Sequence, residues 1–382
     1  MEGDYNMATF NVELKKVVDE SYDIEIGKNL LPMLVEDLKS GLIKGANRYA
    51  IVTDSNVKEL YGDKLLGMMK EAGFDVNLIS FPAGEKSKVR SVKEYIEDTM
   101  IDLGYKRDSC IIAVGGGVVT DMAGFVAGTF GRGIPFINYA TSLLGAADAS
   151  VGGKTAVDTP VATNLIGLIY QPKKLYIDID AWNTLPKEHI SNGLAETIKH
   201  AVLADREFFT FLEQNVDKLL EDGGVDKYPE ICERIAETNC KIKYEVVKKD
   251  EREANLRQIL NLGHTVGRAI ETLSDYKLLH GEAVAIGLVM QARIAEKLGY
   301  ASKEDVKRVE ELTIKAGLPI DIPEYMSTEE VVNKLYTDKK VRKGKIRFVF
   351  QKGIGDVMCF EDGNYSTPLE EAVIREFITE LR

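Results

Sequence analysis

One carboxylate and two imidazoles stand in stretches of the sequence that are otherwise mostly apolar. Glu196 lies in GLAETIKHA, His264 lies in NLGHTVGRAIE, and His280 precedes the apolar run of LLHGEAVAIGLV. Such a set is common for a catalytic divalent metal that keeps coordination positions open. The three residues are far apart in sequence, so spacing leaves a second interpretation open, in which both histidines are capped or core residues.

A row of polar residues accompanies His264. Arg257, Asn261, His264 and Arg268 share one face of a single predicted helix, because residues three and four apart point the same way. Apolar residues fill the neighbouring positions, and the two glycines of this stretch each cost about 1 kcal/mol relative to alanine. A solvated surface helix would favour Glu and Lys instead. The pattern therefore favours an inward-facing row that holds an anion, a metal or both.

A lysine beside two glycines offers another anion-binding group. The segment ADASVGGKTAVD, residues 147–158, places Lys154 after the glycines and near Asp148. The segment is not a P-loop, because GxxxxGK[ST] requires glycine where Asp148 stands. Lys154 either holds a phosphate oxygen or is a solvated loop lysine. Further along, Glu196 and Lys199 lie one turn apart on one predicted helix face.

A glycine turn marks a candidate nucleotide site. AVGGGVVTDMAGFVAGTF, residues 113–130, predicts a strand, a turn and a helix. Gly115, Gly116 and Gly117 would let the backbone approach a pyrophosphate, to which the helix N-terminus offers unpaired N–H groups. Thr120 occupies the third glycine position of GxGxxG, so this is not the usual dinucleotide fingerprint and a plain tight turn is the alternative.

Two further loops follow predicted strands and carry polar side chains. Asp54 and Asn56 come just past one strand end, where they could accept ribose hydroxyls, and Glu85 and Lys88 lie in FPAGEKSK. Open parallel sheets bind ligands beyond the carboxyl ends of their strands, where all three loops would lie. Together the loops favour a nucleotide site.

Short apolar strands alternate with helical stretches in the first half of the chain, which predicts a parallel sheet. After TLPKE the pattern becomes mostly amphipathic helix, apart from LPIDIP and a hairpin-like stretch at 345–360. We therefore predict an α/β domain over residues 1–187 and a mainly helical domain over residues 188–382. The predicted strands are 49–54, 76–81, 110–117, 135–140 and 174–180.

The composition is ordinary for a globular protein. Of 382 residues, 45% are hydrophobic and 29% are charged, enough for two domains with sizeable cores. A net charge of -12 argues against nucleic acid or an anionic membrane as the main partner. No apolar run approaches the roughly 18 residues of a membrane span, and no signal peptide is recognisable. The four cysteines lack CxxC spacing. We expect a cytoplasmic protein with reduced thiols.

Several sequence blocks, taken together, resemble one enzyme family. GGGVVTDMAGFVA, DASVGGKT, NLIG, TLP, GLAETIKHA, DEREANLRQILNLGHT and LLHGEAVAIG occur in this order. They are similar to blocks of the 3-dehydroquinate synthases and the wider sugar phosphate cyclases, from about residue 20 to residue 360. The resemblance implies a Rossmann-like NAD-binding α/β domain, an all-α metal- and substrate-binding domain, an active site in the cleft between them, and a homodimer.

The resemblance also implies roles for individual residues. Glu196, His264 and His280 would bind a catalytic zinc or cobalt ion. Contacts with the hydroxyls and carboxylate of the substrate would come from Asp148, Lys199, Lys243 and Asn261. The phosphate end would comprise Lys154, Asn164, Arg257 and either Lys339 or Lys340, with Arg132 from a second subunit. Cofactor contacts would come from Asp54, Asn56, Glu85, Lys88, Gly116, Gly117, Asp121, Thr141, Ser142 and Thr184.

The reaction that the resemblance implies is the conversion of 3-deoxy-arabino-heptulosonate 7-phosphate to 3-dehydroquinate and phosphate. This is a step of the shikimate pathway of aromatic amino acid biosynthesis. NAD transiently oxidises a secondary alcohol, phosphate is eliminated, the hydride returns, and an intramolecular aldol step closes the ring. NAD is regenerated in each turnover.

Two departures from the family pattern touch the predicted site. Thr163 precedes Asn164 where the family usually has lysine, and Arg268 stands where it usually has histidine. We hypothesise that Arg268 serves the phosphate end as a permanently charged, bidentate donor that cannot shuttle protons near neutral pH. YATS, residues 139–142, replaces the usual Pro-Thr-Thr in the same region.

Three alternatives remain open from the sequence. Related cyclases act on an amino analogue of the same substrate, on sedoheptulose 7-phosphate or on glucose 6-phosphate. A metal-dependent polyol dehydrogenase would share the two-domain plan but would accumulate NADH and would not need a basic phosphate site. A non-catalytic nucleotide-binding protein would not need the three metal ligands.

Overall fold

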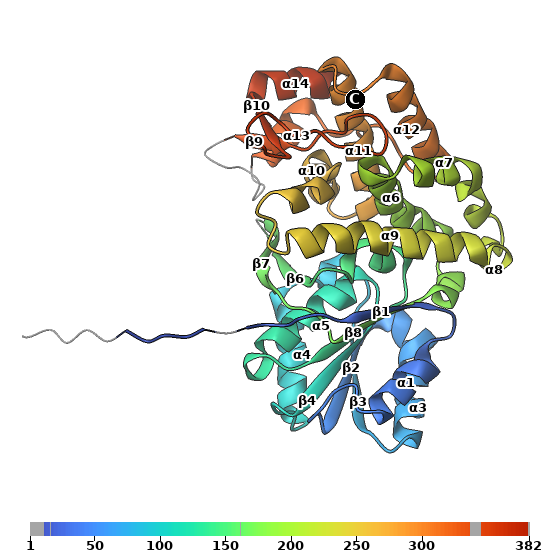
Figure 1. Cartoon of the computed structure of the whole chain (residues 1–382), viewed down its shortest axis with the longest axis vertical. Coiled ribbons are helices and arrows are strands. Elements are labelled where there is room, and N and C mark those ends of the chain that lie inside the picture. The colour runs from blue at the N-terminus through green and yellow to red at the C-terminus, as the bar shows by residue number, and fades with distance from the viewer. Residues whose placement is uncertain (1–10, 16, 161, 337–344, 381–382) are drawn as a thin grey trace, which may run out of the picture.

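The computed structural model describes residues 11–15, 17–160, 162–336 and 345–380 (Figure 1). Its first part is built around a six-stranded sheet whose strands run parallel, in the order β1-β8-β5-β4-β2-β3. The fold class and all five predicted strands are confirmed. The strands are β1 (Asp23–Gly27), β2 (Arg48–Asp54), β3 (Asp75–Phe81), β4 (Ser109–Gly115), β5 (Phe136–Ala140) and β8 (Lys174–Asp178).

The edge strand β1 was not predicted, because its sequence, DIEIG, is short and half polar. Helices cover both faces of the sheet, and alternate residues of each strand point to opposite layers. On one face α1 and α3 pack on Ile51 and Ile112, and on the other α4 and α5 pack on Val52 and Ile111. The helices are α1 (Leu31–Lys39), α3 (Asp63–Glu71), α4 (Arg90–Asp102) and α5 (Gly117–Thr129), with the short α2 (Ser55–Val57) after β2.

An antiparallel hairpin extends this part of the molecule toward the second. Its strands are β6 (Lys154–Thr159) and β7 (Ala162–Ile169). The interpretation of Lys154 as a loop residue is wrong, because β6 begins at this residue. The two glycines before Lys154 indicate a turn, and the strand is recognised only from its pairing with β7.

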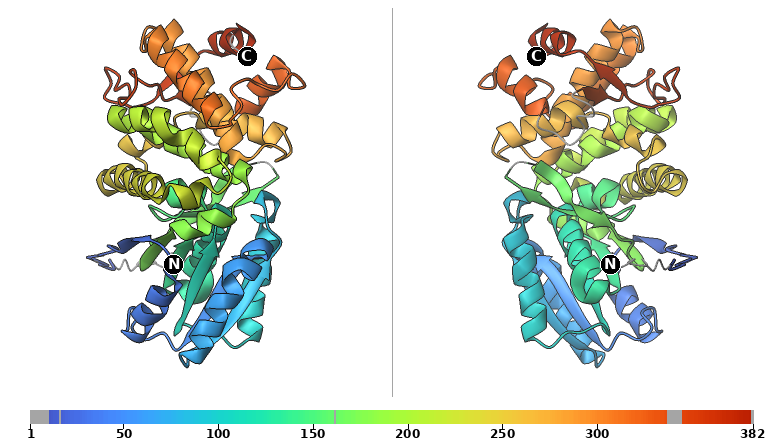
Figure 2. Two further views of the ribbon diagram at one scale, coloured as in Figure 1. Left: turned by 90° about the vertical axis from the view of Figure 1, so that its right-hand side faces the viewer. Right: turned by 90° about the vertical axis from the view of Figure 1, so that its left-hand side faces the viewer.

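The second part is helical apart from one small sheet, and it lies beyond the strand ends of the first (Figures 1 and 2). The hairpin-like stretch at 345–360 does fold back through a bridge between Gln351 and Val357, but β9 pairs with β10 further along the chain. The elements are α6 (Lys187–Ala204), α7 (Arg206–Asn215), α8 (Gly224–Lys227), α9 (Pro229–Lys249), α10 (His264–Leu273), α11 (His280–Lys297), α12 (Lys303–Lys315), α13 (Thr328–Leu335), β9 (Ile346–Phe348), β10 (Thr367–Leu369) and α14 (Glu371–Glu380).

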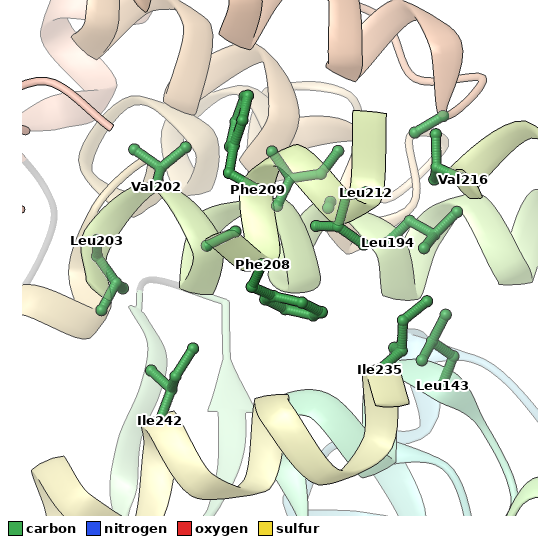
Figure 3. Packing of buried hydrophobic residues seen from close by; sticks show 14 of the residues in the cluster. Leu143, Leu194, Val202, Leu203, Phe208, Phe209, Leu212, Val216, Ile235 and Ile242 are labelled. Carbon is green, nitrogen blue, oxygen red and sulfur yellow. The ribbon is translucent and has the colours of Figure 1, made fainter. Parts of the chain in front are cut away.

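Helix α6 is the centre of the helical part. The sequence predicts an amphipathic helix, but every residue from Ile190 to Leu203 is buried, because α7, α9, α11 and α12 surround it. Figure 3 shows Leu194 and Val202 of α6 among the side chains of α7 and α9, with Leu143 of the sheet part nearby. This apolar cluster therefore runs through both parts. The boundary near residue 187 stays a prediction, since α6 packs against both.

Shorter helical turns connect the main elements. They span Lys58–Gly62, Glu85–Ser87, Phe130–Arg132, Gly145–Ala149, Ile179–Thr184, Val216–Leu220 and Leu256–Asn261. Among the described residues, no helix is both long and apolar enough to cross a bilayer.

Candidate active site

A cleft of about 1310 Å³ lies between the sheet part and the helical part. One wall consists of the loops that follow β2, β3, β4, β5 and β8, at the carboxyl ends of the parallel strands. The other wall includes α10, the start of α11 and the turn before α10. The three polar loops noticed in the sequence thus meet at one edge, as expected for an open parallel sheet.

The predicted metal ligands come together at the base of the helical wall. Glu196 projects from α6, His264 opens α10 and His280 opens α11. Glu196 Oε1 lies 3.2 Å from His264 Nε2 and 3.3 Å from His280 Nε2. Potential ligand atoms of the three residues lie within 4.8 Å of one another. One carboxylate oxygen and two imidazole nitrogens converging on one point fit a divalent metal such as zinc.

The outer nitrogen of each imidazole also has a partner. His264 Nδ1 lies 3.2 Å from the Leu262 carbonyl, and His280 Nδ1 lies 3.2 Å from Glu271. Burial lowers the pKa of His264 to about 4, which keeps this imidazole in the neutral form that binds metals. Burial also opposes protonation of His280, but Glu271 and Glu196 outweigh it and raise its pKa, so a metal would displace a proton there.

The row of polar residues is not one helix, and this prediction was wrong. Leu256–Asn261 forms a 3-10 turn, Gly263 adopts a left-handed conformation with φ of 80°, and α10 starts at His264. The break follows from close packing of α10 on α11. A Cβ on Gly287 would lie 1.9 Å from the Gly263 carbonyl, so only glycine allows the two backbones to meet. This contact brings His264 and His280 together, with ring centroids 5.4 Å apart.

Beside the metal ligands lies a network of one acid and two buried lysines. Lys243 is 2.8 Å from Asp148, and Lys199 pairs with Glu196 and lies 3.8 Å from Asp148. Burial alone would raise the pKa of Asp148, but Lys243 and Lys199 hold it well below its ordinary value. Asp148 and Lys243 line the cleft, whereas Lys199 and Glu196 lie just behind its surface.

A second basic group gathers where the hairpin meets the turn before α10. Lys154 forms an ion pair with Glu253, whose carboxylate also accepts a hydrogen bond from the Asn261 amide. Arg257 is buried and donates to the carbonyls of Glu251 and Gly152. Glu253 was not predicted as a cleft residue, because it lies in a run of charges that is typical of a solvated surface. Its φ of 58° turns it toward the cleft instead.

Arg268 lines the same cleft one turn after His264, and Thr163 of the hairpin lines it as well. Its Nη1 atom is buried and has no hydrogen-bond partner among the described residues. Asn164 also lines the cleft, with its backbone held by Asp158 at 2.7 Å. A buried guanidinium nitrogen without an acceptor leaves a place for an anion.

The loops of the sheet wall hold the predicted cofactor contacts. Lys88 is buried, 2.6 Å from Asp121 and 3.6 Å from Glu85. Burial would lower the pKa of Lys88, but these carboxylates outweigh it and hold the pKa above its ordinary value. The remaining predicted contacts that line the cleft are Asp54, Asn56, Gly116, Gly117, Thr141, Ser142 and Thr184.

A few predicted residues lie elsewhere. Gly115 ends β4 outside the cleft lining, and a Cβ there would meet Val119 at 2.5 Å, so its packing alone requires glycine. Arg132 lies outside the cleft in the turn after α5, with a left-handed φ of 72°. Lys339 and Lys340 fall outside the described residues.

Comparison with known proteins agrees with this geometry. The family model "3-dehydroquinate synthase N-terminal" matches residues 78–192, and "3-dehydroquinate synthase C-terminal" matches residues 193–341. The 3-dehydroquinate synthase of Pelobacter propionicus is 45% identical over 340 residues, covering 88% of this chain and 92% of the relative. That of Desulforamulus reducens is 42% identical over 357 residues, covering 93% and 97%. The chain belongs to the 3-dehydroquinate synthase family.

Solved structures of other sugar phosphate cyclases share the whole architecture. A 2-epi-5-epi-valiolone synthase from Streptomyces hygroscopicus, with NAD+ and Zn2+ bound, has a TM-score of 0.83 at 26% identity, covering 97% of this chain and 98% of that one. A 2-deoxy-scyllo-inosose synthase with carbaglucose-6-phosphate, NAD+ and Co2+ has a TM-score of 0.81 at 26% identity, covering 94% and 96%. A glycerol dehydrogenase from Schizosaccharomyces pombe, at 16% identity, shares the fold alone.

Proposed function

We propose that this member of the 3-dehydroquinate synthase family converts 3-deoxy-arabino-heptulosonate 7-phosphate to 3-dehydroquinate and phosphate. One observation carries the proposal. A single cleft joins a Glu-His-His metal site, a nucleotide edge and a cluster of basic residues. A dehydrogenase needs the first two, but only an enzyme that releases phosphate also needs the third.

Two bound groups would supply the chemistry that side chains lack. Glu196, His264 and His280 would hold a divalent metal, for which we propose zinc or cobalt, and it would polarise the substrate oxygen as a Lewis acid. NAD, bound along the loops that carry Asp54 and Gly116, would remove and return a hydride. The N/O ligand set and the ions bound to the two related cyclases support the choice of metal.

The chain's own residues would bind and orient the substrate. Asp148 and Lys243, held against each other beside the metal ligands, would bind its hydroxyls and carboxylate, together with Asn261. At the phosphate end, Lys154, Asn164 and Arg257, together with Arg268, would bind the phosphate and stabilise its charge as it leaves. Holding both ends of one flexible molecule keeps its intermediates in place through successive steps.

We further propose a homodimer in which Arg132 reaches the phosphate end of a second copy. Arg132 is held in a left-handed conformation on a turn outside its own cleft, which fits a residue that acts on a neighbour. We also propose a cytoplasmic location, which four cysteines without disulfides support. Size measurement by light scattering and rescue of Arg132→Ala by mixing with a second inactive variant would test the dimer.

A substrate panel tests the proposed reaction. The purified protein, supplied with zinc and NAD, is offered the heptulosonate phosphate and, separately, sedoheptulose 7-phosphate and glucose 6-phosphate. We expect 3-dehydroquinate and phosphate from the first substrate only. Activity confined to another sugar phosphate would make this chain a different cyclase, with Thr163 and Arg268 as the residues that set its specificity.

A further inference from the structure

Glu271 is a buried acid that the roles assigned above do not use. It lies on α10 two turns after His264, on the same helix face, and its side chain is only 9% exposed. Its two carboxylate oxygens lie 3.2 and 3.3 Å from His280 Nδ1. An acid buried this deeply needs a partner, and its carboxylate contacts His280, one of the proposed metal ligands.

The geometry fixes the tautomer of His280. A carboxylate accepts hydrogen bonds and cannot donate them, so Nδ1 carries the proton. Nε2 faces inward, 3.3 Å from Glu196 Oε1, and it is this nitrogen that offers its lone pair once a metal has displaced its proton. Without an outer acceptor the ring could exchange tautomers or rotate, and the ligand nitrogen would be lost from the site for part of the time.

The two histidines use different hydrogen-bond acceptors at Nδ1. His264 donates from Nδ1 to the Leu262 carbonyl, a backbone group that no substitution removes. His280 depends on the Glu271 side chain, which also adds negative charge next to the imidazole. A charged acceptor makes the ring a stronger base and hence a better ligand.

We propose that Glu271 is a positioning residue, which orients His280 and strengthens its bond to the divalent metal. The inference rests on the proposed function, because it requires that Glu196, His264 and His280 bind a metal. It adds an outer carboxylate to that site. Sequence spacing does not reveal this contact, since Glu271 lies seven residues from one histidine and nine from the other.

The test compares Glu271→Gln with a matched control in the same cleft, Glu253→Gln. Glutamine keeps the shape of each side chain and removes its charge. The contacts of Glu253 with Lys154 and Asn261 place its carboxylate in the basic group instead of beside a metal ligand's ring nitrogen. Metal-stripped proteins are titrated with cobalt against a competing chelator, and the visible spectrum of bound cobalt is recorded. Thermal midpoints are measured with and without metal.

We expect Glu271→Gln to weaken cobalt binding by about 10 to 100-fold and to alter the cobalt spectrum. Glu271→Asp, which keeps the charge, should recover part of the affinity and serves as the second variant if the glutamine protein does not fold. The upward shift of the thermal midpoint on metal binding should be smaller than in the wild-type protein. Glu253→Gln should change cobalt affinity less than about twofold.

Two results would overturn the inference. Cobalt affinity of Glu271→Gln within twofold of wild type would show that the carboxylate does not support the ligand. An equal fall of the midpoint with and without metal, at unchanged affinity, would show that Glu271 only stabilises the fold. Failure of the wild-type protein to bind any divalent metal would instead remove the metal site itself, and with it the proposed function.

Discussion

At the metal end of the cleft, formed by Glu196, His264 and His280, each imidazole has partners for both ring nitrogens. The phosphate end differs. Lys154 is paired with Glu253, and Arg268 presents a buried nitrogen that has no acceptor in the described part of the chain. The metal end is thus organised by the packing of the protein, whereas we expect the phosphate end to be completed by a charge that arrives with a ligand.

The two ends depend on different features of the sequence. The metal end depends on backbone contact between α10 and α11, which glycines permit, and on the central helix α6. The phosphate end draws its residues from the hairpin, the turn before α10 and α10 itself. The first should therefore respond to changes in packing, and the second to changes in charge.

Removal of a metal ligand should have the largest effect. His264→Ala should reduce turnover by about 1000-fold or more, equivalent to roughly 4 kcal/mol, because Lewis-acid catalysis is lost. Metal content by atomic emission and turnover would be measured on the same sample. NAD affinity serves as the control and should remain near wild type, since the nucleotide loops belong to the other wall. Full metal content in the variant would contradict the ligand assignment.

Separation of α10 from α11 tests the packing of the metal end. Gly287→Ala should destabilise the protein by about 3 kcal/mol, because the added methyl group meets the Gly263 carbonyl. It should also weaken metal binding, as His264 moves away from His280. The matched control is Gly67→Ala in α3, where a Cβ meets nothing within 4 Å. That change should be neutral or stabilise by up to about 1 kcal/mol. Equal unfolding midpoints for the two variants would contradict the proposed role of the contact between Gly287 and Gly263.

Much of this site could be predicted from the sequence, because its signals are local. Glycines after an apolar strand, polar residues just past strand ends, and acid and histidine in apolar helices each indicate chemistry without knowledge of the fold. Glu253 and Glu271 could not be predicted in this way. Each looks like an ordinary helical or surface acid until Lys154 or His280 is placed beside it by tertiary structure.

The errors in secondary structure have a similar origin. A 3.6-residue period runs through residues 257–268, but contact with α11 requires a left-handed Gly263, and tertiary packing overrides the period. The start of β6 at Lys154 depends on pairing with β7, and no local sequence pattern indicates this pairing. Predicted element boundaries are wrong where contact with a distant segment determines where the element begins.

Loss of charge tests the phosphate end. Arg268→Ala should raise the Michaelis constant for the phosphorylated substrate by about 10 to 100-fold, as expected for a charge-assisted hydrogen bond of about 1.5–3 kcal/mol. Metal affinity should not change. Arg268→Lys, which keeps the charge but not the planar fork, should show an intermediate effect. If Arg268→Ala left both the Michaelis constant and phosphate release as they are in wild type, Arg268 would have no role in phosphate binding.

A buried histidine behind the site should give the smallest effect. His200 is fully buried with Nδ1 3.0 Å from Asn239, and burial lowers its pKa from 6.5 to about 4. As the pH falls, His200 therefore binds a proton in the unfolded chain before it does so in the folded protein. Its contribution to the free energy of unfolding is fully present above about pH 6.5 and is lost as the pH drops toward 4. Between pH 7 and pH 5, the free energy of unfolding should fall by about 1–2 kcal/mol less in His200→Gln than in the wild-type protein, because the titrating imidazole is gone. Thermal midpoints of both proteins at the two pH values would show it, and parallel losses would contradict the assignment.

The most direct test is a single-turnover experiment with the zinc-loaded, NAD-bound protein and the heptulosonate phosphate. Absorbance of NADH, release of phosphate and formation of 3-dehydroquinate are followed on one time base. A cleft that joins metal, nucleotide and phosphate sites for one cyclisation predicts NADH that rises and returns to baseline, with phosphate and dehydroquinate in equal amounts. NADH that accumulates without phosphate release would contradict the account and identify a dehydrogenase.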